Sequence, residues 1–231
     1  FTLPDDLYIT SICDFGAYLF IMCSPVFGGS SSKAYLWNRD TSLTTATEVI
    51  DFGQGSAMVA ENINGAVVVV MSNRIPTTNT VFNHYTKIMV KVYAGGVPIT
   101  VYETTTTSET FKLYNFKAKH DNRVYFACSA SLNGTALHQI WVCGKNGSGN
   151  WFVSPDRLVN NNTTLTGSIQ GFSIIGDYLW VGFNGDGTFY RTRYSSAIYP
   201  TATYESLINP DMPEGERSKK KKLEYVAVSK A

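Results

Sequence analysis

The recurrence of one four-strand unit is the feature that most constrains how this chain of 231 residues can fold. The unit is clearest between Phe111 and Val153, where four segments of strand composition are separated by turns rich in Asn, Asp and Gly. Because short polar turns join neighbouring segments, the unit predicts an antiparallel four-stranded meander. Its strands begin at Phe111, Arg123, His138 and Asn150.

The same unit is predicted three more times, so that four units cover residues 7–53, 56–103, 109–159 and 166–208. Leu19, Val67, Val124 and Leu179 follow the first turn of each unit and lie about 50 residues apart, a period typical of propeller blades. The second strand of each unit is the most continuously apolar, as expected of a strand covered on both faces. We predict an all-β, β-propeller-like fold with four antiparallel four-stranded blades.

A β-sandwich is the competing arrangement, since it also uses short strands and frequent turns, but it does not explain the four-strand recurrence. Four blades rarely close a ring, and an open arc leaves strand edges bare. We therefore expect the chain to be part of a larger ring, and the isolated chain to self-associate. The edges concerned would be Tyr8–Cys13 or Glu48–Phe52 in the first unit and Ala202–Leu207 in the fourth.

The chain changes character after the fourth unit. Residues 209–222 combine Pro, Gly and acidic residues with four consecutive lysines, and residues 223–231 have the composition of one more strand. A basic run can bind nucleic acid, but Glu214 and Glu216 lie beside this one and no aromatic residues interleave with it. We interpret 209–222 as a polar linker and 223–231 as a strand that leads into a further domain or a closing contact.

Charge and hydropathy argue against two classes of partner. The formal net charge is +1 and only 16% of residues are charged, so no electrostatic case for nucleic-acid binding exists. The longest apolar runs, 18–23 and 66–71, are far shorter than the roughly 20 residues of a membrane helix. We expect neither a nucleic-acid partner nor a membrane span.

The four cysteines are predicted to be free thiols. Antiparallel pairing about the first turn would place Cys23 opposite a residue near Tyr8 rather than opposite Cys13, and Cys128 and Cys143 show a similar offset. Each cysteine lies in an apolar strand, where a thiol packs as a small hydrophobe.

The propeller-like repeats, the low-charge composition rich in Thr, Asn and Tyr, and the segment from Glu205 to Lys230 resemble tailed-bacteriophage virion proteins. In such proteins a propeller-like domain is followed by a polar hinge and a second β-rich domain. The resemblance implies a non-enzymatic structural or interaction module of a tail or other virion component, assembled in the host cytoplasm. The implied partners are other virion proteins, copies of the chain itself, or a host-surface glycan or receptor.

A carbohydrate-active or carbohydrate-binding propeller is the alternative function. Gly144–Trp151 is similar in spacing to the Asp-box of sialidase-type propellers, a turn-building device remote from catalysis, with Asn146 at the Asp position. Asn73–Pro76 is similar to the Arg-Ile-Pro motif of the same enzymes, in which the arginine binds a substrate carboxylate. Sialidases need several such arginines and converging acids. The arginines here are scattered, and Asp14, Glu61 and Asp177 fall at turns without a rule that makes them converge.

No catalytic, cofactor or metal residue is assigned from the sequence. Asn184–Thr188 is similar to a calcium loop but lacks the distal Glu, and a hairpin turn explains it better. His84, His120 and His138 lack metal-ligand spacing and are expected at the surface. Short loops rich in Asn, Ser and Thr account for the sequons at Asn133, Asn146, Asn161 and Asn162. For the virion hypothesis, the predicted contact loops are Phe27–Lys33, Thr77–Tyr85 and Asn160–Thr166.

Overall fold

The computed structural model describes residues 3–26, 30–40, 46–73, 87–105, 110–132, 135–158, 169–176, 178–183 and 189–193. The chain separates into two compact units, Phe1–Thr192 and Arg193–Ala231. All described residues except Arg193 belong to the first unit. The predicted linker at 209–222 and the predicted strand at 223–231 lie outside the described residues.

The described residues form β-strands and no helix, which confirms the all-β prediction. The strands are β1 (Leu7–Phe15), β2 (Tyr18–Pro25), β3 (Ser31–Trp37), β4 (Glu48–Gln54), β5 (Ser56–Ile63), β6 (Ala66–Ser72), β7 (Lys87–Tyr93), β8 (Ile99–Thr105), β9 (Thr110–His120), β10 (Arg123–Leu132), β11 (Thr135–Lys145), β12 (Trp151–Leu158), β13 (Ile169–Ile175), β14 (Tyr178–Phe183) and β15 (Phe189–Arg193).

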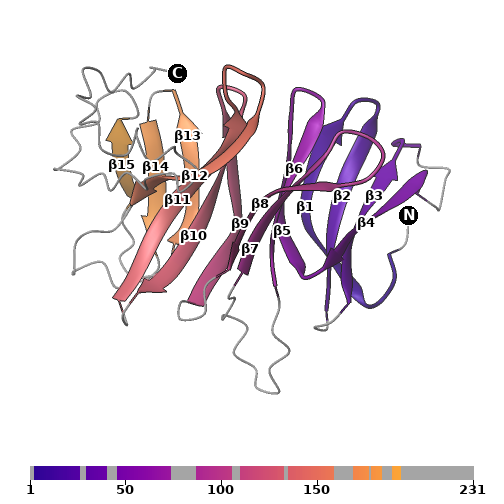
Figure 1. The fold of residues 1–231 in the computed structure, drawn as a ribbon, viewed down its shortest axis with the longest axis horizontal. Helices are drawn as coiled ribbons and strands as arrows, with labels where there is room; N and C mark the ends of the chain where they lie inside the picture. Colours follow the sequence, from indigo (N-terminus) through magenta and orange to yellow (C-terminus); the bar gives the residue numbers. More distant parts are fainter. Residues whose placement is uncertain are drawn as a thin grey trace, which may run out of the picture. The chain divides into compact units, whose positions relative to one another are not determined.

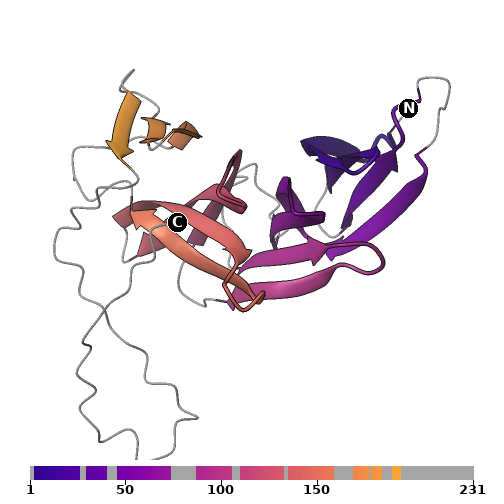
Figure 2. The ribbon, with the colours of Figure 1, turned by 90° about the horizontal axis from the view of Figure 1, so that it is seen from above.

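These strands form four antiparallel sheets, each a meander in chain order (Figure 1). Sheet 1 contains β1 to β4, sheet 2 contains β5 to β8, and sheet 3 contains β9 to β12. Sheet 4 contains β13 to β15, and the fourth strand predicted for it, Ala202–Leu207, lies outside the described residues. The antiparallel β7–β8 pair, in magenta, is seen clearly in Figure 2.

Two-residue loops join the first and second strands of sheets 2 and 3. These loops are Asn64–Gly65 and Asp121–Asn122, and all four residues have positive φ angles. Positive φ at both central positions is the type I′ geometry, whose twist matches that of the flanking strands. Asn, Asp and Gly adopt it at the lowest cost, which is why these dipeptides mark the turns in the sequence.

The pairing of first and second strands is irregular at the same place in every sheet. In β1, β5 and β13 the register skips Thr10, Met58 and Gln170. Each skipped residue lies six positions before the loop that follows its strand (10 to 16, 58 to 64, 170 to 176). In β9 the skip falls between Leu113 and Lys117, in the corresponding part of the strand. Because a bulge bends its strand and increases the local twist, the four first strands share one distortion.

Apolar cores lie on both faces of sheet 2. Val67 and Val69 of β6 belong to a core shared with sheet 1, whereas Val68 and Val70 belong to a core shared with sheet 3. Alternate residues of a strand point to opposite faces, so the uninterrupted apolar sequence of β6 supplies both cores. Full burial of one such valine contributes about 1.5–3 kcal/mol. The prediction that the second strands are covered on both faces is confirmed for β6, of which every residue is buried.

The first strands of successive sheets lie against one another. β1 contacts β5, β5 contacts β9, and β9 contacts β13. Polar side chains on these strands therefore meet although they are far apart in the sequence.

The predicted register of the cysteines is confirmed. Cys23 lies opposite Ile9, one residue from the predicted Tyr8, and Cys143 lies opposite Val124. All four cysteines are free and buried.

Two predictions about local structure are wrong. Ser31–Lys33 was predicted to be part of a surface loop but begins β3. Ser32 is buried there because its hydroxyl donates to the Gly55 carbonyl (2.7 Å) and accepts from the Ala57 amide (3.0 Å). His138 was predicted at a strand end on the surface, but β11 begins earlier, at Thr135, and the His138 side chain is only 5% exposed.

Candidate functional site

Several of the sequence-predicted candidates lie outside the described residues. They are Arg74, Asp177, His84, the sequons at Asn133, Asn161 and Asn162, the segment Asn184–Thr188, and the loops Thr77–Tyr85 and Asn160–Thr166. Of the first predicted contact loop, Ser30 is exposed, whereas Ser31–Lys33 belongs to β3.

The turn between β11 and β12 has the hydrogen bonding of a structural loop. The Asn146 side-chain oxygen accepts from the backbone amides of Ser148 (3.1 Å) and Asn150 (2.9 Å). The Asn146 amide donates to the Asn150 carbonyl (2.9 Å), and the Gly149 amide donates to the Asn146 carbonyl (2.9 Å). Asn146 thus closes the turn on itself, which confirms the prediction that this box-like motif builds a turn.

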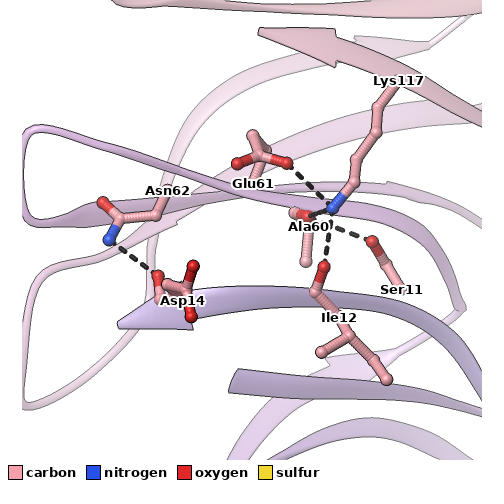
Figure 3. A network of polar contacts seen from close by, with 7 residues as sticks. All are labelled: Ser11, Ile12, Asp14, Ala60, Glu61, Asn62 and Lys117. Carbon is pink, nitrogen blue, oxygen red and sulfur yellow. Dashed lines mark hydrogen bonds and ion pairs between the residues drawn. The ribbon is translucent and has the colours of Figure 1, made fainter. Parts of the chain in front are cut away.

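Lys117 of β9 is the centre of a polar cluster where the first strands of three sheets meet (Figure 3). Its ammonium group donates to the carbonyls of Ile12 (2.9 Å) and Ala60 (2.5 Å). The same nitrogen lies 2.9 Å from the Glu61 carboxylate. Since an ammonium group has three donors, all of them are engaged, and one side chain joins β1, β5 and β9.

Shorter polar side chains reinforce the contact between β1 and β5 in the same cluster. The Ser11 hydroxyl donates to the Ala60 carbonyl at 3.0 Å, and the Asn62 side-chain amide donates to the Asp14 carbonyl at 2.7 Å (Figure 3). The Asp14 carboxylate pairs with Arg39 at an exposed position.

Of the three turn-adjacent acids, Asp14 and Glu61 belong to the described residues and Asp177 does not. Both carboxylates act on the Cys13 thiol, because β1 and β5 lie side by side. Each carboxylate has a cationic partner, Arg39 for Asp14 and Lys117 for Glu61. The chemistry of this cluster is therefore charge pairing between strands.

The thiol at this cluster is held in its protonated form. Burial raises the pKa of Cys13 from 9.0 to about 12, an effect that Lys117 opposes and that Glu61 and Asp14 reinforce. Burial also raises the pKa of Cys128 and of Cys143 to about 12, and of Cys23 to about 11. A protonated thiol is a poor nucleophile and a poor metal ligand, so these residues act as packing groups.

A separate pocket of about 280 Å³ opens among the ends of three hairpins. We call it the hairpin pocket. The residues that line it come from the β5–β6 turn, the β9–β10 turn with the start of β10, and the ends of β11 and β12. They are Ile63, Asn64, Asp121, Asn122, Arg123, Lys145 and Trp151.

Aromatic rings support both cations of the hairpin pocket. The Lys145 ammonium lies 5.0 Å from the centre of the Trp151 ring, and the Arg123 guanidinium lies 5.7 Å from the centre of the Phe152 ring. The stem of Arg123 also passes so close to Gly144 that a Cβ there would lie 2.9 Å from its Cγ. Among the described residues, neither cation has an ion-pair partner.

Sequence reasoning missed both groups of residues. A signal for Lys117 existed, because it is a charged residue between Phe116 and Ala118 in a predicted strand. The hairpin pocket had no such signal, since its cations belong to segments that only the fold brings together.

The described residues contain no group of three or more His, Cys, Asp or Glu that could hold a metal ion. They also contain no helix long and apolar enough to cross a membrane. No protein-family model matches the chain, and a search of curated proteins gives no significant match.

Proposed function

We propose that this chain is a rigid, non-enzymatic interaction module built as part of a β-propeller-like ring. The observation that carries the proposal is the fastening of successive sheets to one another at their first strands. Lys117 alone connects three sheets.

Further bonds between sheets 1 and 2 support the rigidity of the module. The Ser24 hydroxyl of β2 donates to the Ala57 carbonyl (2.6 Å), and the Lys91 ammonium of β7 donates to the Phe52 carbonyl (2.6 Å). The Tyr93 hydroxyl donates to Glu48 across the same boundary (3.2 Å). A scaffold fixed in this way can present its loops in a constant geometry.

The arrangement of cores supports a propeller rather than a sandwich. A sandwich has one core between two sheets, whereas sheet 2 shares cores with both sheet 1 and sheet 3. Successive contacts among β1, β5, β9 and β13 are consistent with these being the innermost strands of propeller blades. We infer that further blades or another chain complete the ring, since four sheets rarely close one by themselves.

The virion setting rests on the resemblance of the repeats, the composition and the segment from Glu205 to Lys230 to tailed-bacteriophage proteins. In this setting the partners are other virion proteins or copies of the chain, and the module is carried in the particle. The pairing of Asp14 and Glu61 with cations supports a structural over a hydrolytic role, because glycoside hydrolysis needs a free acid and base.

Electron microscopy of the parent particle tests the proposal. Antibodies raised against the 231-residue chain should label one fixed position on purified particles, and a reconstruction there should show a ring of blades. The isolated chain should self-associate in sedimentation experiments and should not hydrolyse chromogenic glycosides. Labelling of no particle component, or turnover of a glycoside by the purified chain, would overturn it.

A further inference from the structure

We propose that the hairpin pocket binds a sugar ring that carries a carboxylate. This site goes beyond the proposed function, which leaves the chemistry of the contacted partner open. It is also independent of the virion setting, because it rests only on the residues that line the pocket.

Charge is the first argument for an acidic ligand. Two cations, Arg123 and Lys145, line the pocket against one carboxylate, Asp121. Asp121 already has a partner, because its carboxylate lies 3.1 Å from the His120 ring nitrogen. The cations are held by aromatic rings instead of by acids, so their N–H groups remain available to an incoming carboxylate.

An excess of hydrogen-bond donors is the second argument. The side-chain amides of Asn64 and Asn122 and the indole N–H of Trp151 have no hydrogen-bond partner among the described residues, and all three residues line the pocket. Hydroxyl groups on a sugar ring can accept from such donors and can donate to the amide oxygens. A small carboxylate such as acetate has only two acceptor oxygens, too few to serve both cations and all three of these donors.

Size and shape are the third argument. Pockets for drug-sized ligands measure roughly 300–1,000 Å³, so this smaller pocket of about 280 Å³ fits a single ring. The lining combines apolar Ile63 and Trp151 with polar groups, which suits a ring that has C–H faces and hydroxyl edges. The amide-bearing turns are short type I′ loops, so the backbone that carries these donors is ordered before a ligand arrives.

The test is a titration followed by NMR. Methyl glucuronide and methyl glucoside are the matched probes, because they differ only in the carboxylate at C6. The readout is the indole N–H signal of Trp151, which is one of four tryptophans and is assigned with W151F. Methyl glucuronide should shift this signal and bind at least about tenfold more tightly than the glucoside, a difference of 1.4 kcal/mol.

Two substitutions test the assignment of the cations. R123Q and K145Q should each weaken methyl glucuronide binding at least about tenfold, since each removes a charge-assisted contact. D121N should strengthen binding, because it removes the like charge. K119Q is the matched control, since Lys119 is an exposed lysine on β9 that does not line the pocket, and it should bind as the unsubstituted chain does.

Three outcomes would overturn the inference. The first is no shift of the Trp151 signal with methyl glucuronide, and the second is equal binding of the uncharged glucoside. The third is an equal affinity for acetate, which would make the pocket a general anion site. Each variant is first checked for an unchanged urea midpoint, so that loss of binding is not mistaken for loss of folding.

Discussion

Removal of the Lys117 ammonium should destabilise the fold far more than removal of another lysine from the same strand. K117M keeps an unbranched side chain but deletes the donors to Ile12, Ala60 and Glu61. Three groups from two other sheets would lose their partner in one substitution.

The expected loss of unfolding free energy is about 2–4 kcal/mol. Hydrogen bonds to a charged group contribute about 1.5–3 kcal/mol each, so three of them set an upper limit well above this range. Two features of the cluster reduce the loss. The Ala60 carbonyl keeps the Ser11 hydroxyl as a donor, and Glu61 is 20% exposed, so water replaces part of what it loses. For a domain of this size, the loss corresponds to about 4–16 °C in Tm.

Urea unfolding, followed by tryptophan fluorescence and circular dichroism, measures this loss. K119M is the matched control, because Lys119 is exposed on the same strand and should cost less than about 0.5 kcal/mol. A double-mutant cycle with E61Q isolates the Lys117–Glu61 term, for which we expect a coupling energy of about 0.5–3 kcal/mol. If K117M costs no more than K119M, Lys117 does not fasten the sheets and the argument for a rigid module fails.

Four further predictions concern backbone space, buried hydroxyls, thiol reactivity and pH dependence. G55A should lower the unfolding free energy by about 3 kcal/mol, because φ is +127° and the new Cβ would lie 2.6 Å from the Ser72 carbonyl oxygen. G96A is the control, because there is open space around Gly96, and it should cost about 1 kcal/mol. Thermal melts measure both variants. S24A should lower the unfolding free energy by about 1–2 kcal/mol, since it deletes the buried hydrogen bond to the Ala57 carbonyl. S72A should be neutral or stabilising, because the buried Ser72 hydroxyl lacks a partner in the described residues. Urea unfolding measures both variants. The four thiols should resist iodoacetamide in the folded chain, and mass spectrometry should show four modified thiols after denaturation without reductant; two unmodified pairs would contradict the register. Folding raises the thiol pKa values from 9.0 to about 11 or 12, so above pH 9 the thiols ionise more readily in the unfolded chain than in the folded chain. The contribution of the thiols to stability is therefore intact below pH 9 and is lost as the pH rises toward 12. The unfolding free energy should fall by at least about 1 kcal/mol between pH 8 and pH 10.

The repeated sheets were predictable because their signals are local. Asn64–Gly65 and Asp121–Asn122 mark hairpins by residue type, and the apolar stretch of β6 marks a strand buried on both faces. The same local reasoning failed at Ser32, because a Gly- and Ser-rich stretch looks like a loop until a neighbouring strand supplies partners for its hydroxyls.

The polar cluster and the hairpin pocket were not predictable in this way. Lys117 meets Ile12 and Ala60, which lie far from it in the sequence, and no spacing rule connects them. Arg123 and Lys145 reach one pocket only because three hairpins end side by side. Contacts of this kind depend on how sheets pack, and periodicity within one strand carries no information about that.

The shared bulge places a bend in the first strands at a fixed distance from the turn that follows. This distance defines the alignment of one sheet with another. Thr10, Met58 and Gln170 have unrelated side chains, so the backbone position matters and the residue type does not. Deleting Thr10 would remove the bulge and its bend, although Leu7, Tyr8 and Ile9 could keep their partners on β2. Segments grafted from one sheet into another must therefore be aligned on the distance from bulge to turn.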